Sequence, residues 1–132
     1  RGKKIFVITE GVIPYLSIEQ VTELAGDLKA RPSFFFWTAE YLAPFVYPYL
    51  KNPRRMARMK NAPFLFFPDD WLGVFAASGW GVKEMRYLPE VGITINRHAP
   101  KPWWAFLFFP FRHTEWARKY LRMSGYVLFR SH

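Results

Sequence analysis

Residues 3–17 have the sequence KKIFVITEGVIPYLS. Residues 5–8 are apolar and rich in β-branched side chains, and they lie between two lysines and a glycine turn. A run that is apolar on both faces is typical of a strand inside a parallel sheet, so we expect a buried strand here. Glu10 then stands at the carboxyl end of this strand, where open α/β sheets bind their ligands, and Gly11 lets the chain turn. Glu10 is therefore either a ligand-binding acid or a residue that merely solvates the strand end.

A helix and a second strand should follow this turn. Ser17 and Gln20 have the spacing of a capping box, in which each side chain bonds the amide of the other residue. The helix should end near Lys29, because Arg31 precedes a proline and is pushed out of the helical region. Residues 33–38 are again apolar and aromatic, which predicts a second buried strand. Strand, helix and strand in this order predict a βαβ unit with a parallel pair.

Glu40 and Tyr41 come after the second predicted strand, so we expect them on the same rim as Glu10. Glu40 is equally well explained as a surface acid that leads into a helix. Residues 42–60 have a helical pattern that prolines divide into a short piece and a later helix.

The later helix carries the cations Arg54, Arg55 and Arg58. Such a run is either a solvated helix face or a patch that faces phosphate or lipid.

The next part of the chain predicts a short helix and a strand. Asp69 or Asp70 can cap a helix that begins at Trp71, and Gly79 suits the left-handed position after its end. Residues 80–88 mix apolar and charged side chains, which favours a strand at a sheet edge.

Residues 89–110 are rich in proline and glycine, and we interpret them as a loop. The aromatic run at 103–109 is either an interfacial membrane anchor or a lid over a cleft. A short helix through 114–123 and a last strand at 125–131 complete the prediction.

Size and composition set broad limits. A chain of 132 residues, 51% of them hydrophobic, suits a single globular domain with one core. The net charge of +9 favours anionic partners, and the absence of cysteine excludes disulfides and thiolate chemistry. No apolar run reaches the roughly 18 residues of a membrane-spanning helix, and the N-terminus does not resemble a signal peptide, so we expect a cytoplasmic protein. The abrupt N-terminal strand suggests a fragment of a longer chain.

Local catalytic motifs are missing from these residues. There is no GxGxxG, no P-loop and no nucleophile elbow. His98, His113 and His132 lack metal-ligand spacing, so we expect no metal site and assign no catalytic base.

The order of elements resembles a known enzyme family. Residues 5–16 followed by a capped helix are similar to the motif after the fourth strand in S-adenosylmethionine-dependent methyltransferases related to leucine carboxyl methyltransferases. The matching pairs are Glu10-Gly11, Val12-Ile13 and Tyr15-Leu16. The segment from Asp70 to Trp80 resembles the family's stretch before its sixth strand, and residues 125–131 would be its antiparallel seventh strand.

This resemblance implies a fold and a site. The fold would be α/β, the C-terminal half of a doubly wound, mostly parallel sheet with its last strand antiparallel. Glu10 and Gly11 would bind S-adenosylmethionine, while Tyr15, Glu40 and Tyr41 would lie on the side of an unknown methyl acceptor. The glycine-rich loop and the ribose-binding acid of the family would precede Arg1, so we expect these residues to form only part of the cofactor site. The implied reaction is methyl transfer to a carboxyl or hydroxyl oxygen of a small molecule or protein.

A second hypothesis comes from charge and aromatic content alone. A basic, non-enzymatic module would bind anionic membrane or nucleic acid through residues 51–60 and 101–122. Reversing the charge of Arg54, Arg55 and Arg58 distinguishes the two hypotheses.

Overall fold

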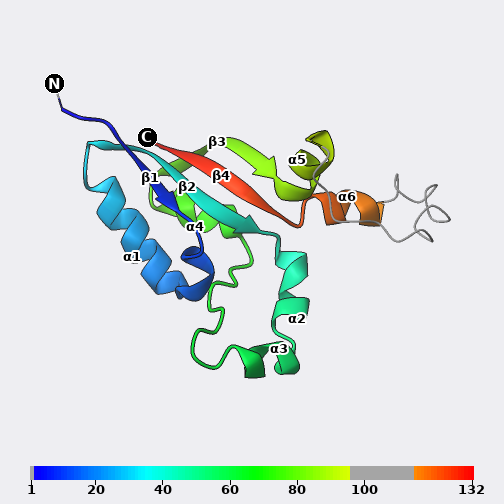
Figure 1. The fold of residues 1–132 in the computed structure, drawn as a ribbon. Coiled ribbons are helices and arrows are strands. Elements are labelled where there is room, and N and C mark those ends of the chain that lie inside the picture. The colour runs from blue at the N-terminus through cyan, green and yellow to red at the C-terminus, as the bar shows by residue number, and fades with distance from the viewer. Residues whose placement is uncertain (1, 96–114) are drawn as a thin grey trace.

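The computed structural model describes residues 2–95 and 115–132, which form a four-stranded sheet with helices around it (Figure 1). In chain order, the elements are β1 (Ile5–Thr9), the 3-10 turn η1 (Ile13–Tyr15), α1 (Ile18–Lys29), β2 (Phe34–Leu42), the 3-10 turn η2 (Pro44–Val46), α2 (Tyr47–Leu50), α3 (Pro53–Arg58), α4 (Trp71–Ala77), β3 (Trp80–Tyr87), α5 (Leu88–Thr94), α6 (Glu115–Leu121) and β4 (Ser124–Ser131).

The strands lie in the order β1-β2-β4-β3, and only β1 and β2 are parallel. β4 runs antiparallel to both β2 and β3. The prediction of a doubly wound, mostly parallel sheet is therefore wrong, whereas the antiparallel last strand and the edge position of the third strand are confirmed. The reason is the position of β4, which lies between β2 and β3 and pairs with both of them. β2 and β3 are therefore not neighbours, and β1–β2 is the one parallel pair among the strands of the described residues.

The predicted βαβ unit is present. The Ser17 hydroxyl accepts a hydrogen bond from the Gln20 amide at 3.2 Å, and the Ser17 amide donates to the Gln20 side chain at 2.9 Å. This capping box starts α1, which ends at Lys29 as predicted. α1 then connects β1 to its parallel neighbour β2.

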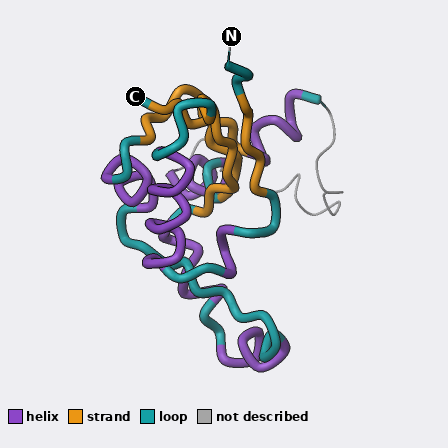
Figure 2. Tube along the Cα trace, turned by 90° about the vertical axis from the view of Figure 1, so that its left-hand side faces the viewer, coloured by secondary structure: helices purple, strands orange, loops and turns teal. Residues whose placement is uncertain are grey.

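The core lies between the sheet and helices α1 and α4, which pack on one face of it (Figure 2). Trp37 of β2 is fully buried, with its ring centroid 5.1 Å from that of Phe75 and 5.5 Å from that of Trp80. Phe129 stacks on Phe75 at 4.6 Å. The buried indole of Trp80 donates to the Ala25 carbonyl at 2.9 Å, which ties β3 to α1.

β1 is an edge strand and is not buried on both faces. Phe6 is 52% exposed and Ile8 is 63% exposed, so the prediction of a buried strand is wrong for this part of the chain. The apolar run indicated a strand correctly, but its neighbours in the sheet decide how much of it is covered.

Other differences concern element boundaries. β2 continues to Leu42, so Glu40 and Tyr41 lie within the strand instead of after it. α5 occupies the start of the predicted loop, because Pro89 stands in the first helical turn, where its missing N–H costs no hydrogen bond. The aromatic run at 103–109 lies outside the described residues.

Candidate functional site

The carboxyl ends of β1 and β2 bring two predicted acids together. Glu10 follows β1 directly, and Glu40 lies near the end of the adjacent strand β2. Between them the chain turns at Gly11, whose φ of 67° is a left-handed conformation that glycine adopts without strain. The Gly11 amide donates a hydrogen bond to Oε1 of Glu40, which fixes the turn against β2.

Tyr126 on β4 adds a third group to this rim. Its hydroxyl donates to Oε1 of Glu10 at 3.3 Å, across 116 positions of sequence. Burial raises the pKa of the Tyr126 phenol, and the charges of Glu10 and Glu40 raise it further. The phenol therefore keeps its proton at neutral pH and remains a hydrogen-bond donor.

A cavity of about 270 Å³ opens beside this rim. Glu40 and Tyr126 line it on one side, and most of its remaining wall is apolar. Several aromatic side chains contribute to this wall: Tyr41, Phe64, Phe66 and Trp71. Apolar walls with few polar groups are typical of small-molecule sites.

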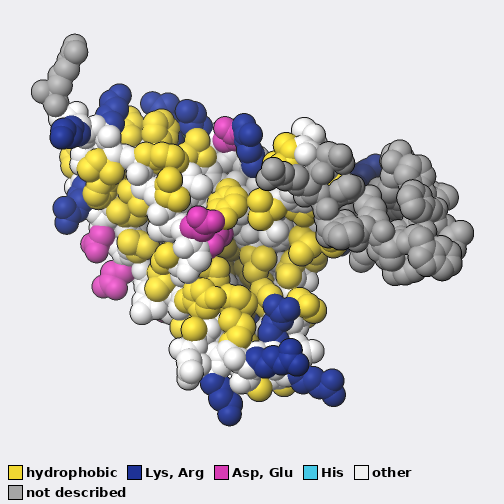
Figure 3. Space-filling view, viewed as in Figure 1, with side chains coloured by type: hydrophobic (Ala, Val, Ile, Leu, Met, Phe, Trp, Pro, Cys, Tyr) yellow, Lys and Arg dark blue, Asp and Glu magenta, His cyan; other side chains and the backbone are white. Residues whose placement is uncertain are grey.

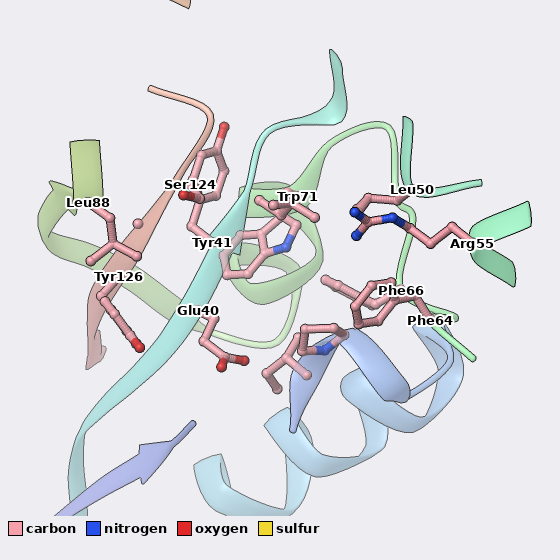
Figure 4. A pocket seen from close by; sticks show the side chains of 14 residues that line it. Glu40, Tyr41, Leu50, Arg55, Phe64, Phe66, Trp71, Leu88, Ser124 and Tyr126 are labelled. Carbon is pink, nitrogen blue, oxygen red and sulfur yellow. The ribbon is translucent and has the colours of Figure 1, made fainter. Parts of the chain in front are cut away.

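Two charged side chains project toward the cavity from opposite sides (Figure 4). Oε2 of Glu40 is buried and has no hydrogen-bond partner among the described residues. Arg55 reaches in from α3, and its Nη2 donates to the hydroxyl of Tyr49 at 2.8 Å. The guanidinium also lies over the Tyr49 ring, 4.5 Å from its centroid. None of the ion pairs found within residues 2–95 and 115–132 includes Arg55 or Glu40.

The aromatic wall is held in place by the backbone of its neighbours. The amides of Leu65 and Phe66 donate to the Pro14 carbonyl of η1 at 2.8 and 3.3 Å. The buried hydroxyl of Tyr47 donates to the Pro68 carbonyl at 2.9 Å, which joins α2 to the segment before α4. Burial, with smaller contributions from Tyr41 and Asp69, raises the pKa of Tyr47 to about 12. Short segments far apart in sequence thus build one wall.

The structure brings most of the predicted site residues together. Glu10, Gly11, Glu40 and Tyr41 all lie at the rim or line the cavity. Tyr15 does not line it; its half-exposed ring lies 5.2 Å from that of Phe64, on the outside of the wall.

Sequence reasoning missed two residues of the site. The sequence pattern places Arg55 only in a run of surface cations and Tyr126 only within a strand, whereas both residues line the cavity. No local pattern identifies either of them, because each reaches the cavity through the arrangement of whole elements.

Among the described residues, no group of three or more His, Asp or Glu side chains is placed to hold a metal ion. None of the helices in residues 2–95 and 115–132 has the length and apolar composition of a membrane-spanning helix. Comparisons of the chain with protein-family models, curated proteins and solved structures found no match.

Proposed function

We propose that the chain forms the acceptor-binding part of an S-adenosylmethionine-dependent methyltransferase that acts on an oxygen atom. One observation carries the proposal: an unpartnered, buried carboxylate oxygen of Glu40 at an apolar cavity, next to the Glu10-Gly11 turn. Buried polar atoms in native proteins are nearly always paired, so an orphaned one beside a cavity indicates a ligand that supplies the missing donor.

The rim has features that suit the cofactor. The Glu10 carboxylate is exposed, and the hydrogen bond it accepts from Tyr126 is long, so its oxygens are available to hydroxyl or ammonium groups. A Cβ built on Gly11 would meet no described atom within 4 Å, so a ligand has room to approach this backbone closely. In this proposal Glu10 and Gly11 contact the cofactor, as the family resemblance implies.

Glu40 supplies the chemistry that the acceptor needs. When bound, S-adenosylmethionine would supply a methyl group on a sulfonium sulfur, a leaving group that can take the electron pair of the C–S bond while the acceptor oxygen gains the methyl group. Oε2 of Glu40 accepts the hydrogen bond of the acceptor hydroxyl and then its proton. The apolar wall excludes water and holds the acceptor oxygen in position, which is the main source of rate enhancement in such a transfer.

Calorimetry tests the cofactor part of the proposal. S-adenosylmethionine and its demethylated product are titrated into the longest natural polypeptide that carries this chain, and into its Glu10→Ala and Glu23→Ala variants. Glu23 is an exposed acid on α1 and serves as the control for loss of one charge. We expect micromolar binding that falls at least about tenfold in Glu10→Ala only. A folded protein that binds neither compound, or equal binding by both variants, contradicts the proposal.

A basic surface is the second candidate function. Arg54 and Arg58 are exposed on α3 and form no ion pair with any described acid. Lys and Arg side chains gather at the lower end of the molecule, where no acidic side chain is visible (Figure 3). Under this hypothesis, replacing Arg54, Arg55 and Arg58 by glutamate abolishes binding to anionic vesicles or nucleic acid. Under the methyltransferase proposal, the same variant still binds the cofactor.

A cytoplasmic location remains a prediction of the proposed function.

A further inference from the structure

The cavity beside Glu40 has two polar ends and an apolar middle, and this division specifies the chemistry of its ligand. At one end, Oε2 of Glu40 has no partner, while Oε1 already accepts from Gly11. A carboxylate oxygen only accepts hydrogen bonds, so the ligand has to bring a donor to this position. The neighbouring phenol of Tyr126 does not fill the role, because it donates to Glu10.

Arg55 marks the other end of the cavity. A guanidinium carries five N–H donors, and the structure pairs one of its nitrogens with the Tyr49 hydroxyl. Its lack of an acidic partner among the described residues leaves donors for an anionic group at the cavity mouth. Arginine binds carboxylates with two parallel hydrogen bonds, which gives direction as well as charge.

The middle of the cavity suits a flat apolar group. Its aromatic walls come from β2, the 63–67 segment and α4. Rings of this kind pack against another ring in edge or offset arrangements. A volume of about 270 Å³ lies just below the usual range of roughly 300–1,000 Å³ for small-molecule pockets, so the site suits a compact ligand with one ring.

We propose that the cavity binds a single-ring aromatic acid with a hydroxyl group, the hydroxyl at Glu40 and the carboxylate at Arg55. The hydroxyl is then the methyl acceptor, and this last step rests on the proposed methyltransferase function. The binding mode itself does not depend on that function. The anionic anchor and the reacting oxygen are at opposite ends of the ligand, so the carboxylate positions the acceptor and is not itself methylated.

The probe for this proposal is 3-(4-hydroxyphenyl)propionate, measured by calorimetry with and without the demethylated cofactor. Two analogues each remove one end: 3-phenylpropionate lacks the hydroxyl, and 3-(4-hydroxyphenyl)propan-1-ol lacks the charge. Arg55→Met and Glu40→Gln remove the matching protein groups. Arg58→Met is the control, because it makes the same charge change on α3 at a residue that does not line the cavity. Circular dichroism checks that each variant is folded.

We expect the wild type to bind the probe at least about tenfold more tightly than either analogue, since both polar contacts are charge-assisted. Arg55→Met should remove the preference over the propanol and retain the preference over 3-phenylpropionate. Glu40→Gln should remove the preference over 3-phenylpropionate and retain the preference over the propanol. Arg58→Met should keep both preferences.

Two results overturn the inference. The first is equal weakening of probe binding by Arg55→Met and Arg58→Met, which would indicate attraction by general positive charge only. The second is absence of probe binding at millimolar concentration by the folded protein in both conditions. Probe binding with the expected pattern in a protein that binds no cofactor would retain the site and refute the methyltransferase function. Cofactor binding without probe binding would refute the proposed ligand of the cavity and retain the methyltransferase function.

Discussion

Thr9, the last residue of β1, connects the candidate rim to the core, and its replacement by valine has a calculable cost. Its Oγ1 donates to the Thr38 carbonyl at 3.2 Å and accepts from the indole nitrogen of Trp37 at 3.0 Å. The Trp37 side chain is 0% exposed, so water has no access to the indole once Thr9 loses its hydroxyl. An unpaired buried donor costs about 1–3 kcal/mol, and the added methyl group recovers at most about 0.8 kcal/mol. We expect Thr9→Val to lower the free energy of unfolding by about 1–2 kcal/mol.

Urea unfolding followed by tryptophan fluorescence measures this loss, with the m-value unchanged. The decisive experiment is the same substitution in a Trp37→Phe background, where no indole remains to be orphaned. There the cost of Thr9→Val should be smaller by about 1–2 kcal/mol. Thr22→Val is the control, because the Thr22 hydroxyl bonds the Ile18 carbonyl on the exposed side of α1; its effect should stay within about 0.5 kcal/mol. An equal cost of Thr9→Val in both backgrounds would refute the reasoning.

Three further predictions concern stability. Gly125→Ala should lower the free energy of unfolding by about 2 kcal/mol or more, because its Cβ would overlap the Arg86 carbonyl of β3. Gly26→Ala in α1 is its matched control, because a Cβ built on Gly26 meets no described atom within 4 Å. The higher helix propensity of alanine should raise the free energy of unfolding by about 0.5–1 kcal/mol. Tyr47→Phe should cost about 1–3 kcal/mol at pH 8, since the buried Pro68 carbonyl loses its donor. With a pKa raised from 10.0 to about 12, neutral Tyr47 supplies stability that is complete below pH 10 and is lost toward pH 12. The difference between the Phe variant and the wild type should therefore shrink across that window in urea titrations, and a constant difference would contradict this assignment.

Glu10 shows how far the sequence predicted the site. Its position after an apolar run and before Gly11 was enough to place it at the carboxyl end of a strand. The capping box of Ser17 and Gln20 and the Asp70 cap of α4, which accepts from the Gly73 amide at 2.9 Å, were predictable for the same reason. Each of these features depends on residues a few positions apart, whose geometry is set by one helical turn or one strand end.

Tyr126 and Arg55 show what only the tertiary structure decided. Tyr126 reaches Glu10 because β4 enters the sheet beside β2, and Arg55 lines the cavity from α3, an element that follows the carboxyl end of β2. The exposure of Phe6 likewise follows from the edge position of β1 and not from its own apolar side chain. The sequence of this protein by itself determined its strands, most of its helices, the caps of α1 and α4, and the placement of Glu10 and Glu40 near the carboxyl ends of neighbouring strands. The order of the strands, and with it the polar ends of the cavity, depends on contacts between distant segments that no local pattern encodes.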